Sequence, residues 1–279
     1  MTAAARPTQV EGTVIHDLGD DDRPALLCSD LHVPVDGGKV YDLLVAITEA
    51  AVAQQTRLFL LGDLFDSYVS PAQLRVGVYR QVAELLRSAT DAGVDLWILH
   101  GNRDFLLGPE FARATGGRVV AGGIRCRLAR RSSLLLHGDE LCQRDVPYQR
   151  AKRWLRWGPT RWLARRLPLS LAMWVAERAR RRSQMVIQQG DQARFAPTLG
   201  AVDNAFATGC EQLVFGHIHC AGRGRFAGGE HPGDYLVLPA FDQEGVGLFA
   251  AGEDLRFVRV AAAGKGLDPV PDPEPRTFE

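Results

Sequence analysis

Five short apolar runs, each followed at once by polar residues that can bind a metal ion, constrain the fold of this chain more than any other feature. Longer segments between the runs, such as residues 41–54 and 71–90, repeat apolar residues at helical spacing. The runs at 26–28 and 58–61 are continuously apolar, as in strands that are buried on both faces of a sheet. This alternation predicts an α/β fold. The runs lie at residues 25–28, 58–61, 95–99, 133–136 and 213–215.

Composition agrees with a folded, core-forming protein, since 46% of the 279 residues are hydrophobic and 24% are charged. Lys and Arg together number 33, as do Asp and Glu, so the net charge of zero does not favour a polyanionic partner. No signal peptide and no run of about 18 apolar residues is found, which predicts a cytoplasmic protein without a spanning helix. Five cysteines without a CxxC pair argue against a disulfide framework and a structural zinc site.

Polar residues follow each of the five runs, at the strand ends where α/β folds place their sites. Four of the seven histidines lie in these blocks. Two carboxylates, four imidazoles and one amide are a mixture of ligands that suits Mn²⁺, Fe²⁺ or Zn²⁺ better than Mg²⁺ or Ca²⁺. The candidate metal ligands are Asp30, His32, Asp63, Asn102, His137, His217 and His219.

Seven ligands exceed the needs of one ion, so the pattern predicts two ions that share a bridging carboxylate, about 3.5–4 Å apart as in two-metal hydrolases. The ions would attract a phosphate group and acidify a bridging water, which supplies the nucleophile. Arg103, next to the amide ligand, is placed to hold a phosphate oxygen. Gly62, Gly101 and Gly216 precede ligands and fit tight turns close to the ions.

The five blocks resemble the signature of the calcineurin-like metallophosphoesterases. This resemblance implies a two-sheet α/β/β/α sandwich and a dinuclear centre in which Asp63 bridges the ions. It implies that one ion is held by Asp30, His32, Asp63 and His219, and the other by Asp63, Asn102, His137 and His217. The blocks are Asp30-Leu31-His32, Gly62-Asp63-Leu64-Phe65-Asp66, Gly101-Asn102-Arg103-Asp104, His137-Gly138-Asp139 and Gly216-His217-Ile218-His219.

One branch of that superfamily looks closer. Arg103 stands where many relatives carry a catalytic histidine, and the segment 138–142 is followed by Asp145, Tyr148 and Gln149. Over residues 25–226 these features are similar to the UDP-2,3-diacylglucosamine hydrolases of lipid A synthesis. The resemblance implies Mn²⁺-dependent hydrolysis of the pyrophosphate of UDP-2,3-diacylglucosamine. A metal-bridging hydroxide would attack the α-phosphate and release UMP and 2,3-diacylglucosamine 1-phosphate.

The resemblance also implies roles for single residues. This chain departs from the family pattern at two places. After His219 the family has a sequence that contains an arginine, and this chain has Cys220-Ala221. On the cap the family has an asparagine and a lysine, and this chain has Ile187 and Gly190. The implied catalytic residues are Asp63, Asn102, Arg103 and His137. The implied substrate contacts are Asn102, Arg103, Asp145, Tyr148, Gln149, Ser183 and His217.

Two further acids, Asp66 and Asp104, have two possible roles. Each either orients a metal-bound imidazole or caps the helix that follows it.

Residues 150–182 interrupt the alternation of strands and helices. They carry eleven cationic side chains against the single acid Glu177, a net charge of +10, and four of the five tryptophans. A basic, tryptophan-rich pair of helices broken at Pro168 is typical of an interfacial element. The resemblance implies a helical cap over the acyl chains, in a protein bound peripherally to the cytoplasmic surface of the inner membrane. The alternative is a plain helical hairpin that packs its tryptophans on the core.

These features divide the chain into five parts. The two terminal parts, which lack a clear period or are rich in proline, are expected to be loose extensions. Apolar runs after residue 230 predict a meander of further strands at 235–238, 246–250 and 255–260. The parts are an N-terminal extension (1–24), the first part of the catalytic core (25–146), the basic cap insertion (147–189), the second part of the core (190–261) and a C-terminal tail (262–279).

Two other functions fit parts of the sequence. Basic residues interleaved with tryptophan also suit single-stranded nucleic acid, so a phosphodiesterase acting on nucleic acid or another nucleotide-containing substrate is one alternative. A non-catalytic scaffold of the same fold is the other, although the intact set of seven ligands argues against it. The leading hypothesis has a lipid-linked nucleotide sugar as partner and no nucleic acid.

Overall fold

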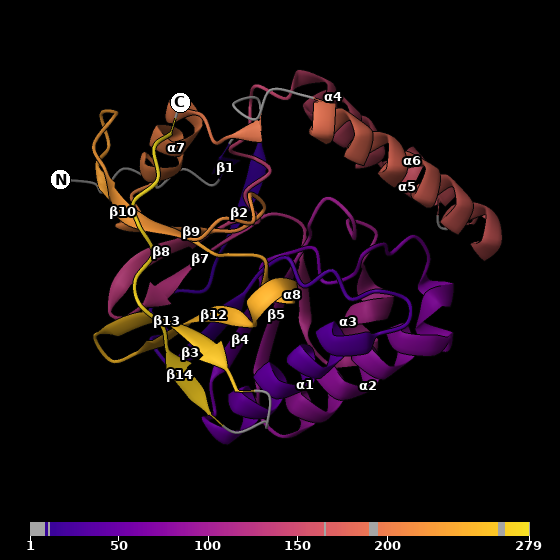
Figure 1. Ribbon diagram of the computed structural model, residues 1–279, viewed down its shortest axis with the longest axis horizontal. Helices are drawn as coiled ribbons and strands as arrows, with labels where there is room; N and C mark the ends of the chain where they lie inside the picture. Colours follow the sequence, from indigo (N-terminus) through magenta and orange to yellow (C-terminus); the bar gives the residue numbers. More distant parts are fainter. Residues whose placement is uncertain (1–8, 11, 165, 190–194, 262–265, 279) are drawn as a thin grey trace.

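Two mixed β-sheets form the centre of the protein (Figure 1). The computed structural model describes residues 9–10, 12–164, 166–189, 195–261 and 266–278. The sheets pack face to face over one apolar core, and a second and a third core lie between their outer faces and the helices. This is the α/β/β/α sandwich that the resemblance to the metallophosphoesterases implies.

The first sheet contains the strands that lead to the first three polar blocks. Its seven strands have the order β14-β13-β12-β3-β4-β5-β6. Strands β3 to β6 run parallel to one another, and β12 pairs antiparallel with β3. The bounds are Ala25–Cys28 (β3), Arg57–Leu60 (β4), Asp95–Leu99 (β5), Arg118–Val120 (β6), Val246–Ala251 (β12), Asp254–Val260 (β13) and Leu267–Pro269 (β14).

The second sheet contains the strands that lead to the last two blocks. Its seven strands have the order β1-β2-β7-β8-β9-β11-β10, and β9 runs parallel to both of its neighbours. The bounds are Gln9–Val10 (β1), Thr13–Asp17 (β2), Gly123–Leu128 (β7), Arg131–Leu135 (β8), Gln212–Phe215 (β9), Gly222–Phe226 (β10) and Gly233–Val237 (β11).

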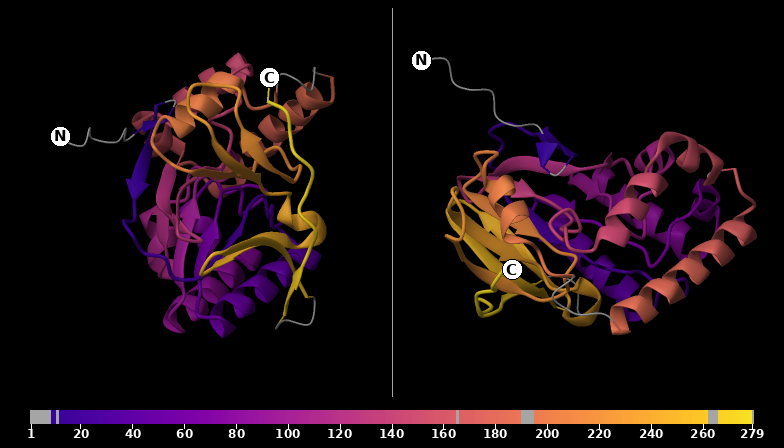
Figure 2. Two further views of the ribbon diagram at one scale, coloured as in Figure 1. Left: turned by 90° about the vertical axis from the view of Figure 1, so that its left-hand side faces the viewer. Right: turned by 90° about the horizontal axis from the view of Figure 1, so that it is seen from above.

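Helices cover the outer faces of the sandwich. Helices α1, α2 and α3 pack on the first sheet and α7 on the second, and the short α8 precedes β12 (Figure 1). Helices α4, α5 and α6 project from one end of the core (Figure 2). The bounds are Gly38–Ala53 (α1), Gly77–Asp91 (α2), Pro109–Thr115 (α3), Val146–Leu155 (α4), Gly158–Ala164 (α5), Leu169–Gln189 (α6), Leu199–Phe206 (α7) and Phe241–Glu244 (α8), with a 3₁₀ turn at Pro71–Arg75 (η1).

Strand β3 shows why the apolar runs become central strands. Leu26 and Cys28 face the core beneath α1 and α2, whereas Ala25 and Leu27 face the core between the sheets. Side chains alternate between the two faces of a strand, and here both faces are covered. Polar side chains are therefore accommodated where the strand ends, which is where Asp30 lies.

The predicted cap helices keep their tryptophans in solvent. Trp154, Trp157, Trp162 and Trp174 are 64%, 59%, 56% and 61% exposed. The alternative of a plain hairpin that packs its tryptophans on the core is therefore wrong. Within the part of the chain that the structure describes, no helix is long and apolar enough to cross a membrane.

One predicted helix is divided in two. The apolar spacing over residues 71–90 predicts a single helix, but η1 ends at Arg75 and α2 begins at Gly77. Between them Val76 is extended, and Gly77 has a φ of 51°. This left-handed conformation favours glycine and breaks the hydrogen-bond pattern of a continuous helix.

The described residues of both terminal parts form strands that the sequence did not predict, and the predicted meander is wrong in part. Residues 13–17 form β2 in the second sheet, and β14 in the C-terminal part pairs with β13. With Ile15 as the one buried side chain of β2, this strand is too short to show a period in the sequence. Residues 235–237 of the predicted run belong to β11, which pairs with β9 and β10 in the second sheet rather than with β12 in the first.

The C-terminal segment links the two sheets. After β14 the chain reaches the second sheet, where Phe278 packs against Tyr235, Phe226 and Phe215 with ring centroids 4.7, 6.1 and 6.4 Å apart. The hydroxyl of Tyr235 also donates a hydrogen bond of 2.7 Å to the carbonyl of Arg276.

Replacing Phe278 should therefore weaken the whole sandwich. We expect Phe278→Ala to lower the free energy of unfolding by about 1–3 kcal/mol, because it removes aromatic contacts and leaves a gap on the sheet. Urea denaturation measures the change, with the exposed Thr277→Ala as control. Equal stability of the two variants would contradict the packing described here.

Candidate metal centre

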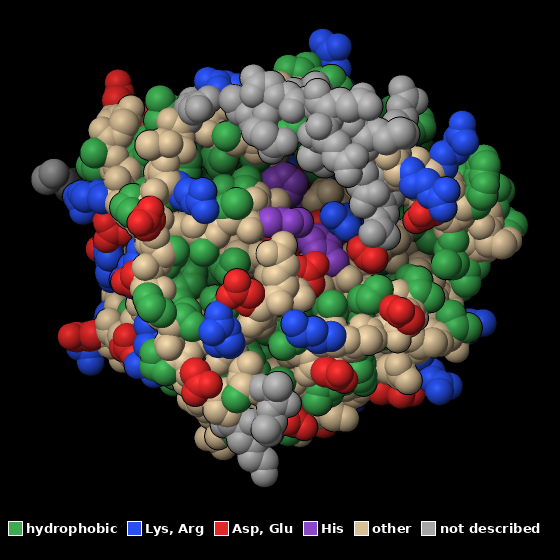
Figure 3. All heavy atoms as spheres, viewed as in Figure 1, with side chains coloured by type: hydrophobic (Ala, Val, Ile, Leu, Met, Phe, Trp, Pro, Cys, Tyr) green, Lys and Arg blue, Asp and Glu red, His purple; other side chains and the backbone are tan. Residues whose placement is uncertain are grey.

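The seven candidate ligands follow the ends of five strands that come from both sheets. These strands end at one rim of the sandwich, and histidine side chains gather there in a hollow of the surface (Figure 3). The structure thus brings together side chains that are up to 189 residues apart in sequence. Asp30 and His32 follow β3, Asp63 follows β4, Asn102 follows β5, His137 follows β8, and His217 and His219 follow β9.

Asp30, His32 and His219 form one half of the cluster. Oδ1 of the fully buried Asp30 lies 3.2 Å from Nε2 of His219 and 4.0 Å from Nε2 of His32. Oδ2 of Asp30 accepts a hydrogen bond of 2.8 Å from the backbone N–H of His217, which fixes the carboxylate. None of the described residues donates a well-aligned hydrogen bond to Oδ1. One oxygen and two imidazole nitrogens thus face a common point.

Asn102, His137 and His217 form the other half. Nδ1 of His137 donates a hydrogen bond of 2.8 Å to the carbonyl of Leu61, so Nε2 is the ring nitrogen directed into the site. That nitrogen lies 3.1 Å from Oδ1 of Asn102. The ring of His217 packs edge to face against that of His137, with centroids 5.0 Å apart. A nitrogen lone pair and an amide oxygen that face each other suit a cation between them.

Asp63 lies between the two halves. Its Oδ2 is 3.3 Å from Nε2 of His32, and its Oδ1 is 3.9 Å from Nε2 of His137. Asp30, Asp63 and His137 also offer ligand atoms that lie within 4.8 Å of one another. One carboxylate therefore faces both halves, as a ligand shared by two ions must. The donor set and its geometry fit divalent metal ions.

Backbone strain is concentrated at this cluster. Of the eight non-glycine residues with positive φ in the described chain, five are candidate ligands, with φ between 48° and 68°. Such left-handed conformations cost about 1–3 kcal/mol each and persist only where the surroundings enforce them. Backbone hydrogen bonds between ligand loops do so here, for example from His32 N–H to the Asp63 carbonyl at 2.9 Å. The five are Asp30, His32, Asp63, His217 and His219.

All three predicted turn glycines are required for close approach of the loops. A Cβ on Gly62, which has a φ of 97°, would lie 2.6 Å from Nδ1 of His137 and 2.9 Å from Cα of Gly101. A Cβ on Gly101 would lie 2.0 Å from Oδ1 of Asp63 and 2.3 Å from its backbone nitrogen. A Cβ on Gly216 would lie 2.1 Å from Oγ of Ser29 and 2.5 Å from Oδ2 of Asp30. Any side chain at these positions would displace a candidate metal ligand.

The buried charges influence one another strongly. Burial alone would raise the pKa values of Asp30 and Asp63. The surrounding histidines have the larger, opposite effect, so both pKa values lie below the usual range and both carboxylates are charged. Burial lowers the pKa of His32, yet hydrogen bonds with Asp242 and Asp63 raise it to about 9. Burial and the nearby His137 lower the pKa of His217 to about 4, so this imidazole is neutral at pH 7.

Arg103 lies beside the cluster as the sequence predicts. Its backbone N–H donates to Oδ1 of Asp63 at 2.9 Å, and its Nη1 donates to Oδ1 of Asp66 at 3.0 Å. Its Nε is 3.5 Å from Oδ2 of Asp63. The side chain of Arg103 is 26% exposed, whereas that of Asp63 is 2% exposed. Asp66 therefore orients this arginine, a role that the sequence did not suggest.

Asp104 joins two ligand loops. Its Oδ2 accepts a hydrogen bond from the backbone N–H of Leu64 at 2.7 Å, and its Oδ1 accepts one from Gly101 at 2.8 Å. Burial and the charge of Asp63 raise its pKa to about 7. Asp104 neither contacts an imidazole nor caps the next helix, since Gly108 precedes α3. Both roles suggested by the sequence are therefore wrong for Asp104.

Sequence reasoning missed Asp242, which is part of the site. Its Oδ2 lies 3.0 Å from Nδ1 of His32 and holds the ring so that Nε2 faces Asp30 and Asp63. Asp242 comes four residues after the predicted strand 235–238. An acid so close to a strand end was the signal that could have revealed it.

The predicted substrate contacts on and near the cap form hydrogen bonds with other residues of the protein, except for Ser183, whose side chain is not among the described residues. Oδ1 of Asp145 accepts from the backbone N–H of Tyr148 at 3.4 Å and caps α4. The hydroxyl of Tyr148 donates to Asp139, and Nε2 of Gln149 donates to the carbonyl of Asp139 at 2.8 Å. The side chains of Ser183 and Ile187, and all of Gly190, lie outside the described residues.

At the rim, Cys220 follows His219 and is exposed, whereas the other four cysteines are buried. Free, reduced thiols are what the sequence predicts.

Similar proteins place this geometry in a family. No family model matches the chain. UDP-2,3-diacylglucosamine hydrolase of Aeromonas salmonicida is 33% identical over 232 residues, which are 82% of this chain and 90% of that protein. The same enzyme of Pseudomonas entomophila is 30% identical over 224 residues, 80% of this chain and 93% of that one. The chain belongs to the UDP-2,3-diacylglucosamine hydrolase family.

This membership makes the protein a hydrolase with a site that can bind divalent metal ions. The enzyme of Pseudomonas syringae pv. tomato is similar as well, with 31% identity over 79% of this chain and 89% of that protein. Among solved structures, a predicted phosphoesterase from Streptococcus pneumoniae aligns with 89% of this chain and 98% of that one, at a TM-score of 0.38 and 11% identity. So weak a likeness carries no argument.

Gly101→Ala should disrupt the metal centre, because the new Cβ would displace Asp63. We expect Mn²⁺ binding and hydrolase activity to fall by about a hundredfold, as for other misplacements of about 1 Å at reacting groups. Isothermal titration and an activity assay measure the loss. Gly200→Ala is the matched control, because nothing lies within 4 Å of its Cβ. Equal metal affinity of the two variants would contradict this account of Gly101.

Proposed function

We propose that the protein hydrolyses the pyrophosphate of UDP-2,3-diacylglucosamine and releases UMP and 2,3-diacylglucosamine 1-phosphate. Five of the seven candidate ligands form two groups whose ligand atoms lie within 4.8 Å of one another, and Asn102 and His217 lie beside His137. This convergence, in a chain whose curated relatives bear the name of this enzyme, is the observation that carries the proposal. The relatives favour neither a nuclease nor a scaffold.

Two divalent ions, in this proposal Mn²⁺, are held by overlapping sets of ligands. Bound ions acidify a water and offset the negative charge of the pyrophosphate. Mixed imidazole and carboxylate donors suit Mn²⁺ better than Mg²⁺, which prefers oxygen ligands alone. The two sets are Asp30, His32, Asp63 and His219 for one ion, and Asp63, Asn102, His137 and His217 for the other.

Arg103 and Asn102 bind the phosphate in this proposal. Arg103 is partly exposed beside Asp63, so its guanidinium can hold a non-bridging oxygen of the α-phosphate. The charge that develops on the phosphate during the displacement is stabilised by the same fixed donor. Water oxygen bonds to the α-phosphorus, the bond to the bridging oxygen breaks, and that oxygen leaves with the sugar 1-phosphate.

Hydrogen bonds to backbone and carboxylate keep the imidazoles oriented. Asp242 holds Nδ1 of His32, and the Leu61 carbonyl holds Nδ1 of His137. The Nε2 atoms are thereby directed towards the site. His217 stays neutral at pH 7 because its pKa is lowered to about 4, and therefore has a lone pair for an ion.

Asp63→Asn should nearly abolish the reaction. The change keeps the shape of the side chain but removes the charge that faces both halves of the cluster, so we expect release of UMP to fall by about a thousandfold or more. Chromatography of UMP after loading with Mn²⁺ measures the activity. Asp91→Asn, on the exposed face of α2, is the control for the loss of one carboxylate.

The position of attack can be tested separately with the unmodified protein. In water enriched in oxygen-18, attack on the α-phosphate places the label in UMP and none in the sugar 1-phosphate. Label in the sugar 1-phosphate would contradict the proposed site of attack. Cleavage of single-stranded oligonucleotides without release of UMP from the lipid substrate would refute the proposed function itself.

Residues 147–189 form, in this proposal, a cap that binds the acyl chains and the surface of an anionic membrane. Trp154, Trp162 and Trp174 are each more than half exposed, as indoles at a lipid interface are. Arginine side chains lie beside two of these rings. Cζ of Arg166 is 3.9 Å from the ring centroid of Trp162, and Cζ of Arg178 is 5.9 Å from that of Trp174. Apolar rings beside cationic groups suit the boundary between acyl chains and anionic headgroups.

Replacing these three tryptophans with serine should release the protein from membranes. We expect affinity for vesicles of phosphatidylethanolamine and phosphatidylglycerol to fall by about tenfold or more, because apolar area no longer enters the bilayer. Co-sedimentation measures binding. Val14→Ser with Val76→Ser is the control, since both valines are exposed outside the cap. Unchanged binding of the triple variant would rule out this surface.

A further inference from the structure

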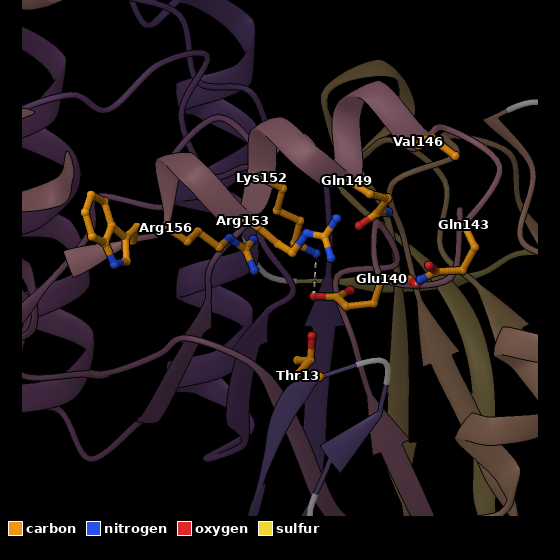
Figure 4. Close-up of a pocket in the computed structure, with 10 residues that line it drawn as sticks. Thr13, Glu140, Gln143, Val146, Gln149, Lys152, Arg153 and Arg156 are labelled. Carbon is orange, nitrogen blue, oxygen red and sulfur yellow. Dashed lines mark hydrogen bonds and ion pairs between the residues drawn. The ribbon is translucent and has the colours of Figure 1, made fainter. Parts of the chain in front are cut away.

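One face of α4 carries three polar side chains that reach back towards the core. Tyr148, Lys152 and Arg156, the residue just after the helix, are four positions apart and so lie along one face. Figure 4 shows Lys152 extending from α4 to Glu140 in the loop below. This face is the one by which the cap is held against the sandwich.

The three side chains converge on Asp139, which is fully buried. Oδ2 of Asp139 accepts a hydrogen bond from the hydroxyl of Tyr148 and lies 2.8 Å from Nζ of Lys152. Nη2 of Arg156 lies 3.7 Å from the same oxygen. Tyr148 and Lys152 lie closer to this oxygen than Arg156 does. The ion pair with Asp139 alone therefore does not account for the position of the Arg156 side chain.

Arg156 differs from the other two because it also contacts a second loop. Its Nη2 donates a hydrogen bond of 3.4 Å to the carbonyl of Gly101, the residue directly before Asn102. Asp139 comes two residues after His137. One guanidinium therefore bridges the two loops from which Asn102 and His137 approach each other to 3.1 Å.

We propose that Arg156 is a positioning residue that couples the docked cap helix to the loop carrying Asn102 and Arg103. The expected fall in kcat on replacing Arg156 rests on the proposed function, whereas the structural coupling does not. Because Arg156 fixes the Gly101 carbonyl relative to Asp139, it sets how the amide of Asn102 faces His137. Displacements of about 1 Å at such groups cost up to a hundredfold in rate. Tyr148 and Lys152 anchor the helix that presents the arginine.

The test compares Arg156→Gln with Arg156→Lys in the full-length, Mn²⁺-loaded protein. For the glutamine variant we expect kcat to fall about tenfold, KM to change less than about threefold, and amide hydrogen exchange over residues 101–104 to accelerate. Lysine keeps the charge but lacks the fork of N–H donors, so it should restore only part of kcat and of the protection. Arg80→Gln, on exposed α2, should leave all of these values unchanged.

Unchanged exchange over residues 101–104 in Arg156→Gln overturns the proposal, whether or not kcat falls. A loss of kcat without faster exchange would mean that Arg156 acts on the substrate itself. If the glutamine variant does not fold, the lysine variant allows the same exchange measurement. Absence of UMP release by the unmodified protein would refute the proposed function, while the exchange comparison would still decide the role of Arg156.

Discussion

Two buried carboxylates, Asp30 and Asp63, impose the condition on which the rest of the site depends. A charged carboxylate is unfavourable in a protein interior unless hydrogen bonds or positive charges compensate it. Here the compensation comes from the backbone N–H groups of His217 and Arg103, from the guanidinium of Arg103 and from the imidazoles around the pair. These compensating groups come from several loops that are far apart in sequence. The acids thus determine which loops must meet, and their charge favours binding of divalent cations at this point.

The architecture makes that meeting possible because the two sheets end at the same rim. The loops approach so closely that Gly101 and Gly216 leave no space for a Cβ, and the ligands adopt left-handed backbone conformations. Energy is therefore stored at the rim and offset by the three apolar cores beneath it. The cap is joined to this region through the ion pairs of Lys152 and Arg156 with Asp139, in addition to apolar packing of Ala164 on the core. Its position and that of the ligand loops are consequently linked by charge.

Much of this could be predicted from the sequence, for reasons that lie in particular residues. Continuously apolar runs such as 25–28 indicate strands covered on both faces, and ligand residue types directly after them indicate where the loops meet. Asp242 escaped notice because a single acid after a strand has no partner nearby in sequence; its partner, His32, is 210 residues away. The roles of Asp104 and Arg156 depend on bonds to backbone groups of distant loops. Residue types alone do not reveal such bonds.

Cys220 is an exposed thiol at the rim that can be labelled selectively. The other four thiols are buried, which raises their pKa values and keeps them unreactive. A maleimide probe added to the native enzyme would consequently attach at one place, directly after His219. A fluorophore or spin label there would report local movement during turnover without the need to engineer a cysteine.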